Sequence, residues 1–144
     1  MKHNAKYVLM NQDVATAGVT TITGTVDTLG FRYASIMFAA ATTNGAHTTI
    51  GNHAVEQSDA SGSGFAAISG FTAGTDWTPS SAALATNVAK VVYNIDLRGR
   101  KRYLKVTFGS PAANVGGVLS AILTNAENGV ATAAEQGAAF TVNG

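Results

Sequence analysis

Few residues in this sequence carry the chemistry that catalysis or metal binding requires. There is no cysteine, which excludes a thiolate nucleophile and a thiolate metal site. The three histidines are His3, His47 and His53. On one predicted strand, His47 and His53 share a face but lie roughly 20 Å apart at about 3.3 Å per residue. Since metal–nitrogen bonds are about 2 Å long, one ion cannot bind both. We interpret each as a residue of a sheet surface.

Nucleophile and phosphate-binding motifs are also missing. Gly-x-Ser-x-Gly, Gly-x-Gly-x-x-Gly and Gly-x-x-x-x-Gly-Lys-Ser/Thr do not occur, and Gly62-Ser63-Gly64 is typical of a turn. A Ser-His-Asp triad can form from distant residues, although no motif indicates one. Most carboxylates fall in predicted turns or tails, where they are commonly solvated. They are Asp13, Asp27, Glu56, Asp59, Asp76, Asp96, Glu127 and Glu135. We therefore expect no enzyme, no cofactor and no catalytic, cofactor-binding or metal-binding residue.

Basic residues are concentrated in one short stretch. Six of the nine lie between Lys90 and Lys105. Clustered cations of this kind bind nucleic-acid phosphates, grip carboxylates on an acidic protein surface, or lie solvated at a hairpin tip. Protein docking is the preferred interpretation, because the stretch lacks exposed aromatics for base stacking. The predicted protein-interaction residues are Arg98, Arg100, Lys101, Arg102 and Lys105.

The composition suggests a surface that is partly covered by partners. Charged residues are only 12% of the 144, about half the usual share, and the net charge is +1. A small monomer normally needs surface charge for solubility, so low charge favours burial against other proteins. A monomer coated with Thr and Ser is the alternative. No apolar run approaches the roughly 20 residues that cross a bilayer, and the first residues lack the apolar run of a signal peptide.

Short β-like runs separated by turn residues extend over most of the chain. Turn signals include Asn44-Gly45 and 58–64. Both faces of 31–42 are largely apolar, which favours a central strand; a helix is the rival interpretation there. The predicted strands are 4–10, 19–27, 31–42, 46–57, 65–69, 88–97, 102–108 and 115–124.

The connections between these strands give further expectations. A polar loop is expected at 11–13, and 70–81 is predicted as a loop in which Trp77 folds back as a lid on the core. Residues 98–101 are predicted to join their two neighbouring strands as a tight hairpin. Gly116 and Gly117 indicate a bulge or a close approach of two backbones.

The spacing of the strands indicates a sandwich or a barrel. The preferred fold is all-β: an antiparallel β-sandwich, jelly-roll-like, with about eight strands and extended terminal arms. The expected organisation is an N-terminal strand and arm at 1–18, a core at 19–124 and a C-terminal arm at 125–144. The two terminal segments are candidates for reaching neighbours, for example by strand addition.

Two segments resemble small virion proteins of tailed bacteriophages, of the capsid decoration or cement type. The first is Val55-Glu56-Gln57-Ser58-Asp59-Ala60-Ser61-Gly62-Ser63-Gly64-Phe65, a strand-turn-strand phrase whose turn is longer here. The second is Tyr93-Asn94-Ile95-Asp96-Leu97-Arg98-Gly99-Arg100-Lys101-Arg102-Tyr103-Leu104-Lys105-Val106. Together they cover about 25 residues of the chain.

The resemblance implies a β-rich structural protein on the outer capsid surface, made in the host cytoplasm. Its implied partners are the major capsid protein, at capsomer junctions, and copies of itself, with a trimer favoured. No membrane partner is expected, and nucleic acid is not favoured. A head-fibre or tail component fits nearly as well. The alternative from another class is a carbohydrate-binding or host-attachment β-sandwich, to which Trp77, Asp76 and Tyr33 would contribute.

Overall fold

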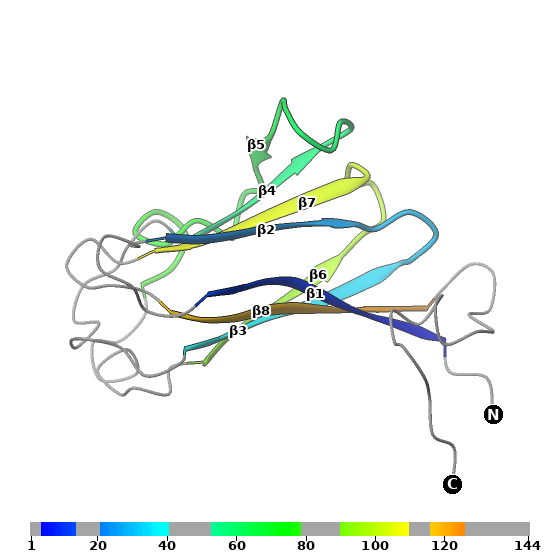
Figure 1. Ribbon diagram of the computed structural model, residues 1–144. Coiled ribbons are helices and arrows are strands. Elements are labelled where there is room, and N and C mark those ends of the chain that lie inside the picture. Colours follow the sequence, from blue (N-terminus) through cyan, green and yellow to red (C-terminus); the bar gives the residue numbers. More distant parts are fainter. Residues whose placement is uncertain (1–3, 14–20, 41–52, 79–89, 110–115, 126–144) are drawn as a thin grey trace, which may run out of the picture.

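The computed structural model describes residues 4–13, 21–40, 53–78, 90–109 and 116–125. These residues form two antiparallel four-stranded sheets and contain no helix. The first sheet has the order β1-β8-β3-β6: β1 (Ala5–Asp13), β8 (Gly117–Thr124), β3 (Tyr33–Ala40) and β6 (Lys90–Asp96). The second has the order β2-β7-β4-β5: β2 (Thr21–Asp27), β7 (Tyr103–Gly109), β4 (Ala54–Ser58) and β5 (Ala66–Ala67). Figure 1 shows them as two stacked layers.

The core lies between the two sheets and is built from alternate residues of the strands. In β2, burial alternates residue by residue, as expected when one face of a strand packs on a core. Phe38 of the first sheet stacks on Phe108 of the second, with ring centroids 3.7 Å apart. The ring of His53 also packs against Phe108, with centroids 3.9 Å apart. Apolar side chains from both layers therefore hold the sheets together.

Several sequence predictions are confirmed. The described residues are all-β with antiparallel strands, and β3 is internal, between β8 and β6. Trp77 is partly buried and packs against the core, as a lid would. Gly117 marks a close approach, because a Cβ there would overlap the carbonyl oxygen of Ala39 and lie 2.8 Å from the Phe38 ring.

The predicted polar loop at 11–13 is wrong, because β1 continues through Asp13. A register shift between Leu9 and Asn11 lets the strand keep pairing with β8 beyond that point. Asn11 also donates a side-chain hydrogen bond to the carbonyl of Thr23, 2.7 Å away, which links β1 to β2. β1 is at the edge of its sheet, where one side of the strand has no neighbouring strand among the described residues, and polar residues such as Asn11 and Gln12 are tolerated there.

The predicted hairpin at 98–101 is also wrong. β6 pairs with β3, whereas β7 pairs with β2 and β4 of the other sheet, so the connection crosses from one layer to the other. Both strands contribute buried side chains to the same core, Tyr93 and Ile95 from β6 and Leu104 and Val106 from β7, but from different sheets. Leu97 is buried at the crossing and donates its backbone N–H to Arg32. Gly99, with φ of 76°, permits the turn that follows.

Other expectations fall partly outside the described residues. The turn at 58–64 is present, and the Ser58 hydroxyl donates to the carbonyl of Ser63 at 2.6 Å. Of the predicted strand 46–57, residues 46–52 lie outside the described residues. Of the two terminal segments, 1–18 and 125–144, the structure describes only 4–13 and residue 125. Residues 5–13 of the first segment form β1.

Candidate functional site

The five predicted interaction residues lie on and after the connection between β6 and β7, and most of them form ion pairs. Acidic side chains from four separate places in the sequence meet them. The pairs are Arg98–Asp96, Lys101–Asp59 at 3.0 Å, Arg102–Asp27 at 2.7 Å and Lys105–Glu56 at 2.6 Å. We call these eight residues the charged cluster. In the sequence, Asp96 is the only acid close to the basic stretch, whereas the fold brings three more acids to it.

Two arginines of the charged cluster grip carboxylates with two nitrogens each. Arg102 donates from Nε to Asp27 Oδ1 at 3.0 Å and from its terminal nitrogen to Oδ2 at 2.7 Å. This contact lowers the pKa of Asp27 and raises that of Arg102. Hydrogen bonds from Arg98 likewise lower the pKa of Asp96 to about 2. Both carboxylates are thus ionised at neutral pH and cancel the cations beside them.

Because of these ion pairs, most of the positive charge of the basic stretch is already neutralised. A surface that attracts phosphates or acidic protein needs positive charge that is not already neutralised. Lys105 and Glu56 are the most enclosed pair, with side chains 27% and 24% exposed, and they join β7 to β4. Arg100 is exposed and forms no ion pair within the described part of the chain. It is thus the residue of the five whose charge remains open to a partner.

Among the described residues, a second surface carries charge only at its margin: the outer face of the first sheet. Large hydrophobic side chains are exposed on all four of its strands, and Leu9 is 59%, Tyr7 51% and Val92 50% exposed. We call this surface the apolar face. Its large exposed members are Tyr7, Leu9, Tyr33, Met37, Val92, Val118 and Ile122.

The strand register places these side chains side by side. Met37 is opposite Val92 on one side and Ser120 on the other, and Leu9 is opposite Ser120 in turn. Tyr7 is opposite Ile122. Side chains at such paired positions lie about 5 Å apart. Ser120 lies between Met37 and Leu9, and Ser35 and Asn94 occupy the next row, so the apolar side chains are close neighbours interspersed with small uncharged polar ones.

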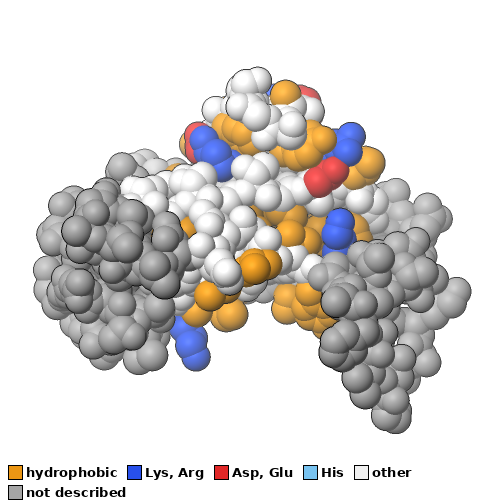
Figure 2. All heavy atoms as spheres, in the orientation of Figure 1, with side chains coloured by type: hydrophobic (Ala, Val, Ile, Leu, Met, Phe, Trp, Pro, Cys, Tyr) orange, Lys and Arg blue, Asp and Glu red, His pale blue; other side chains and the backbone are white. Residues whose placement is uncertain are grey.

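The outer surfaces of the two sheets differ in chemistry. On the apolar face, the charged groups among the described residues lie at its margin: Lys90 and Asp96 at the two ends of edge strand β6, and Arg98, whose guanidinium is 5.7 Å from the centre of the Tyr33 ring. The second sheet exposes Thr21, Thr23 and Thr25 and carries ion pairs. In Figure 2 most of the visible charged side chains lie towards the upper layer, one basic side chain projects at the lower left, and hydrophobic side chains are visible on both layers. A sheet normally keeps one face polar, so the apolar face is the one that indicates a partner.

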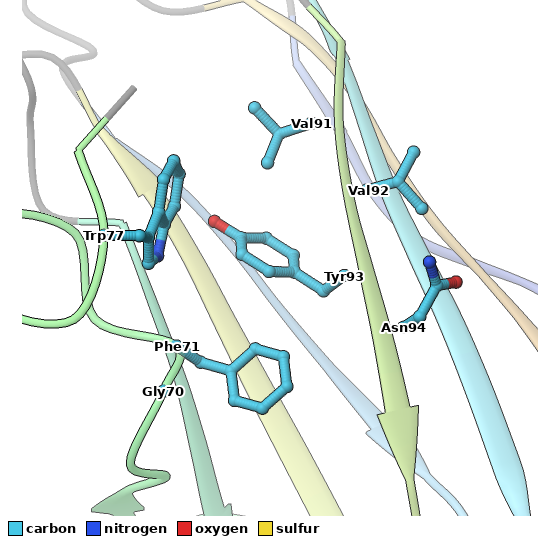
Figure 3. Close-up of a pocket in the computed structure, with 7 residues that line it drawn as sticks. All are labelled: Gly70, Phe71, Trp77, Val91, Val92, Tyr93 and Asn94. Carbon is cyan, nitrogen blue, oxygen red and sulfur yellow. The ribbon is translucent and has the colours of Figure 1, made fainter. Parts of the chain in front are cut away.

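A pocket lies beside the outer edge of β6. We call it the edge pocket; it has a volume of about 240 Å³ and is lined by Gly70, Phe71, Trp77, Val91, Val92, Tyr93 and Asn94. In Figure 3, Tyr93 points from β6 towards Trp77, and Phe71 lies near both rings. The Tyr93 ring is 6.1 Å from Trp77 and 6.2 Å from Phe71, centroid to centroid. Burial raises the pKa of Tyr93 to about 12, so the hydroxyl keeps its proton.

The residues that could support metal or acid–base chemistry do not converge within the described ranges. No group of three or more His, Cys, Asp and Glu side chains there is arranged to hold a metal ion. His53 is only 2% exposed and packs between aromatic rings, so its interpretation as a sheet-surface residue is wrong. His3 and His47 lie outside the described residues. The described part of the chain also has no helix of the length and apolarity that a membrane span requires.

Comparisons with protein-family models, curated proteins and solved structures find no match to this chain.

Sequence reasoning missed the apolar face, although a signal for it is present. In β8, both alternating sets are rich in apolar residues: Leu119, Ala121 and Leu123 are buried, whereas Val118 and Ile122 are exposed. The same pattern on 31–42 led to the correct prediction of a central strand. A central strand in two layers still has one outer face, and apolar residues there are the sign of a docking surface.

Proposed function

We propose that this chain is a non-enzymatic structural protein of a tailed-phage particle, which decorates the capsid and stabilises it by packing against other proteins. The apolar face carries this proposal. It is a largely hydrophobic surface without charge at its centre, on a chain with very few charges, and burial against protein would remove that surface from water. The phage setting rests on the two segments that resemble decoration proteins.

The pairing of the strands supports a β-sandwich of the jelly-roll type. The pairs β1·β8, β2·β7, β3·β6 and β4·β5 are nested, so the chain folds like one long hairpin closed at β4 and β5. Each pair alternates between the two sheets, as it does when such a hairpin rolls up. Jelly rolls build viral capsid domains and also lectins, so this fold is compatible with a virion protein without determining its function.

A second copy of this chain is the partner we propose for the apolar face. Four strands about 4.8 Å apart and about seven residues long, at about 3.3 Å each, cover roughly 440 Å² as a flat area. Protruding side chains make the accessible area larger, and a standard interface buries about 800 Å² on each partner. The face is uncharged at its centre, so the surface that fits it is uncharged too. Another copy offers such a surface, and two such faces packed on each other close a two-fold dimer. The trimer that the resemblance favours would need each face to contact a different surface of the next copy.

The contact with the major capsid protein is proposed for the connection between β6 and β7. Of Arg98, Arg100, Lys101, Arg102 and Lys105, the open charge of Arg100 is best suited to an acidic partner. Binding only to assembled capsid would shift the shell towards the assembled state. Several copies held together would strengthen each weak contact through effective concentration. The location that follows is the outer surface of the virion.

The proposal is tested by locating the chain in particles. Virions of the phage that encodes it would be purified and analysed by mass spectrometry and immunogold labelling with an antibody to the purified chain. We expect the chain in intact particles, with label on the capsid. A gene that lies outside any phage or prophage genome, or a chain missing from complete virions, would show the proposal to be wrong.

Carbohydrate binding on the virion is the second candidate, and the edge pocket is the observation that favours it. Trp77 and Phe71 supply aromatic walls, which suit the apolar side of a sugar ring. The predicted trio does not converge, however. Asp76 closes its own loop by accepting a hydrogen bond from the Thr72 N–H at 2.9 Å, and Tyr33 lies on the apolar face. Glycan binding by the purified chain would favour this candidate.

A further inference from the structure

The edge pocket has a polar group that the fold leaves without a partner. Tyr93 is only 4% exposed, and its hydroxyl makes no hydrogen bond within the described part of the chain. Leaving a buried hydroxyl unsatisfied costs about 1–3 kcal/mol, so such groups usually mark a place where something binds. In Figure 3 this hydroxyl points into the space beside Trp77.

The walls of the pocket are held in place before anything binds. The loop that carries Phe71 and Trp77 is tied to β4 by Ile68 N–H to Val55 and by Ala73 N–H to His53, both at 2.9 Å. These bonds leave the loop little freedom, which lowers the cost of binding. Within the described residues, the Tyr93 hydroxyl thus lacks a hydrogen bond in a region whose backbone groups are hydrogen-bonded.

The position of the pocket indicates what kind of group it accepts. Four consecutive residues of β6, 91–94, line it, so the pocket runs along the edge of the strand rather than over one face. β6 is the last strand of its sheet, and among the described residues no strand pairs with its other edge. An unpaired edge offers backbone N–H and C=O groups to an added strand, and a neighbouring pocket takes one of its side chains.

The size and charge of the pocket narrow the choice of side chain. A cavity of about 150 Å³ is sufficient for a benzene ring, and the edge pocket measures about 240 Å³. None of its lining residues is charged. It therefore fits an aromatic ring carried by an uncharged strand.

The C-terminal part of the sequence contains one such strand. Residues 137–143 read Gly-Ala-Ala-Phe-Thr-Val-Asn, without charge and with the β-forming run Phe140-Thr141-Val142. Phe140 is the only aromatic residue after Asn125. The register puts Thr124, Tyr33 and Asp96 in one row, so the end of β8 is about 10 Å from the end of β6. The eleven residues 126–136 reach up to about 36 Å, so the segment can arrive there.

We propose that residues 137–143 add to the free edge of β6 as a further strand, with the ring of Phe140 in the edge pocket. The Tyr93 hydroxyl then donates a hydrogen bond to a main-chain carbonyl of the added strand. The sequence gives the C-terminal segment as a candidate for strand addition to neighbours; here the addition is within one chain, and it goes beyond the proposed function. It needs neither a capsid nor the apolar face.

The test uses the intrinsic fluorescence of Trp77, which is the only tryptophan in the chain and a wall of the pocket. In the full-length protein, Phe140→Ala should shift Trp77 emission to longer wavelength and increase its quenching by acrylamide. Val130→Ala, also in the C-terminal region but outside the segment, is the matched control and should leave both unchanged. Thermal unfolding of both variants checks that the core is intact.

A synthetic peptide of residues 137–144 should bind the Phe140→Ala protein saturably and reverse the change in emission. The same peptide with Ser in place of Phe140 should not. Tyr93→Phe should weaken peptide binding by up to about tenfold, the loss expected for one hydrogen bond. Glucose and galactose are titrated in parallel.

Wild-type emission and quenching in Phe140→Ala, together with no peptide binding, would show the proposal to be wrong. Saturable quenching by a sugar but not by the peptide would also overturn it and favour the carbohydrate alternative. Since no particle enters the experiment, failure of the capsid proposal leaves the result unaffected. A variant that loses capsid binding but keeps its Trp77 emission and quenching would show that the capsid contact and the added strand are independent.

Discussion

Replacing Met37 by Lys places a charge at the centre of the apolar face. Met37 is 38% exposed in the single chain and lies between Val92 and Ser120. A lysine there keeps a similar apolar stem and extends its ammonium group into water. The cost to the isolated chain should therefore be about 1 kcal/mol or less.

The cost in an assembly is larger. If a second copy covers the face, the ammonium group is buried, and the nearest acid on this face is Asp96, at the far end of β6. An uncompensated buried charge costs about 3–5 kcal/mol. At about 1.4 kcal/mol for each factor of ten, self-association should weaken by more than about 100-fold.

Sedimentation velocity over a range of concentrations measures this effect. Wild-type protein should sediment well above the 14.6 kDa of one chain, and Met37→Lys should move towards that value. Thr23→Lys is the matched control, because Thr23 is exposed on the outer face of the second sheet, opposite Thr107. It should keep the wild-type mass. The reasoning is refuted if Met37→Lys also keeps that mass, or if wild-type protein is a monomer at every concentration.

Three further predictions concern single positions. Gly117→Ala should destabilise the fold by about 3 kcal/mol, because the added methyl meets backbone and a core ring, whereas Gly62→Ala, with open space around it, should stay within about 0.5 kcal/mol; urea unfolding compares them. In an NMR titration, Asp96 should titrate at about pH 2, and Arg98→Gln should return it towards 3.8. Because the folded pKa is the lower one, this contact stabilises the fold above about pH 4 and is lost as the pH falls towards 2. Arg100→Glu should reduce capsid binding in a co-sedimentation assay without changing the melting temperature; unchanged binding would mark that residue as solvated surface.

Local pattern predicted the strands well because alternation and β-branched residues are local properties. It placed β3 at the centre of a sheet, since both of its faces are apolar. It could not assign β6 and β7 to different sheets. Two consecutive strands with a short glycine-containing link look the same in sequence whether they pair side by side or belong to different sheets. Leu97, buried at the crossing, was the available signal.

The candidate sites depended on contacts between distant residues. Asp27 meets Arg102 across 75 positions, so the sequence showed the arginines but not the acids that neutralise them. The apolar face likewise requires knowing which side of each strand faces outward. His53 was misjudged for the same reason, because its burial depends on Phe108 and Trp77.

The nested order of the strands has a consequence for synthesis on the ribosome. β4 and β5 can pair soon after they emerge, but β1 must wait for β8, which begins about 100 residues later. At about 5–20 residues per second this delay is roughly 5–20 s. During that time, Tyr7 and Leu9 belong to a strand with no partner in its own sheet. The nascent chain therefore passes through a stage in which an apolar edge is open to wrong pairing, and folding is complete only after the last strand has emerged.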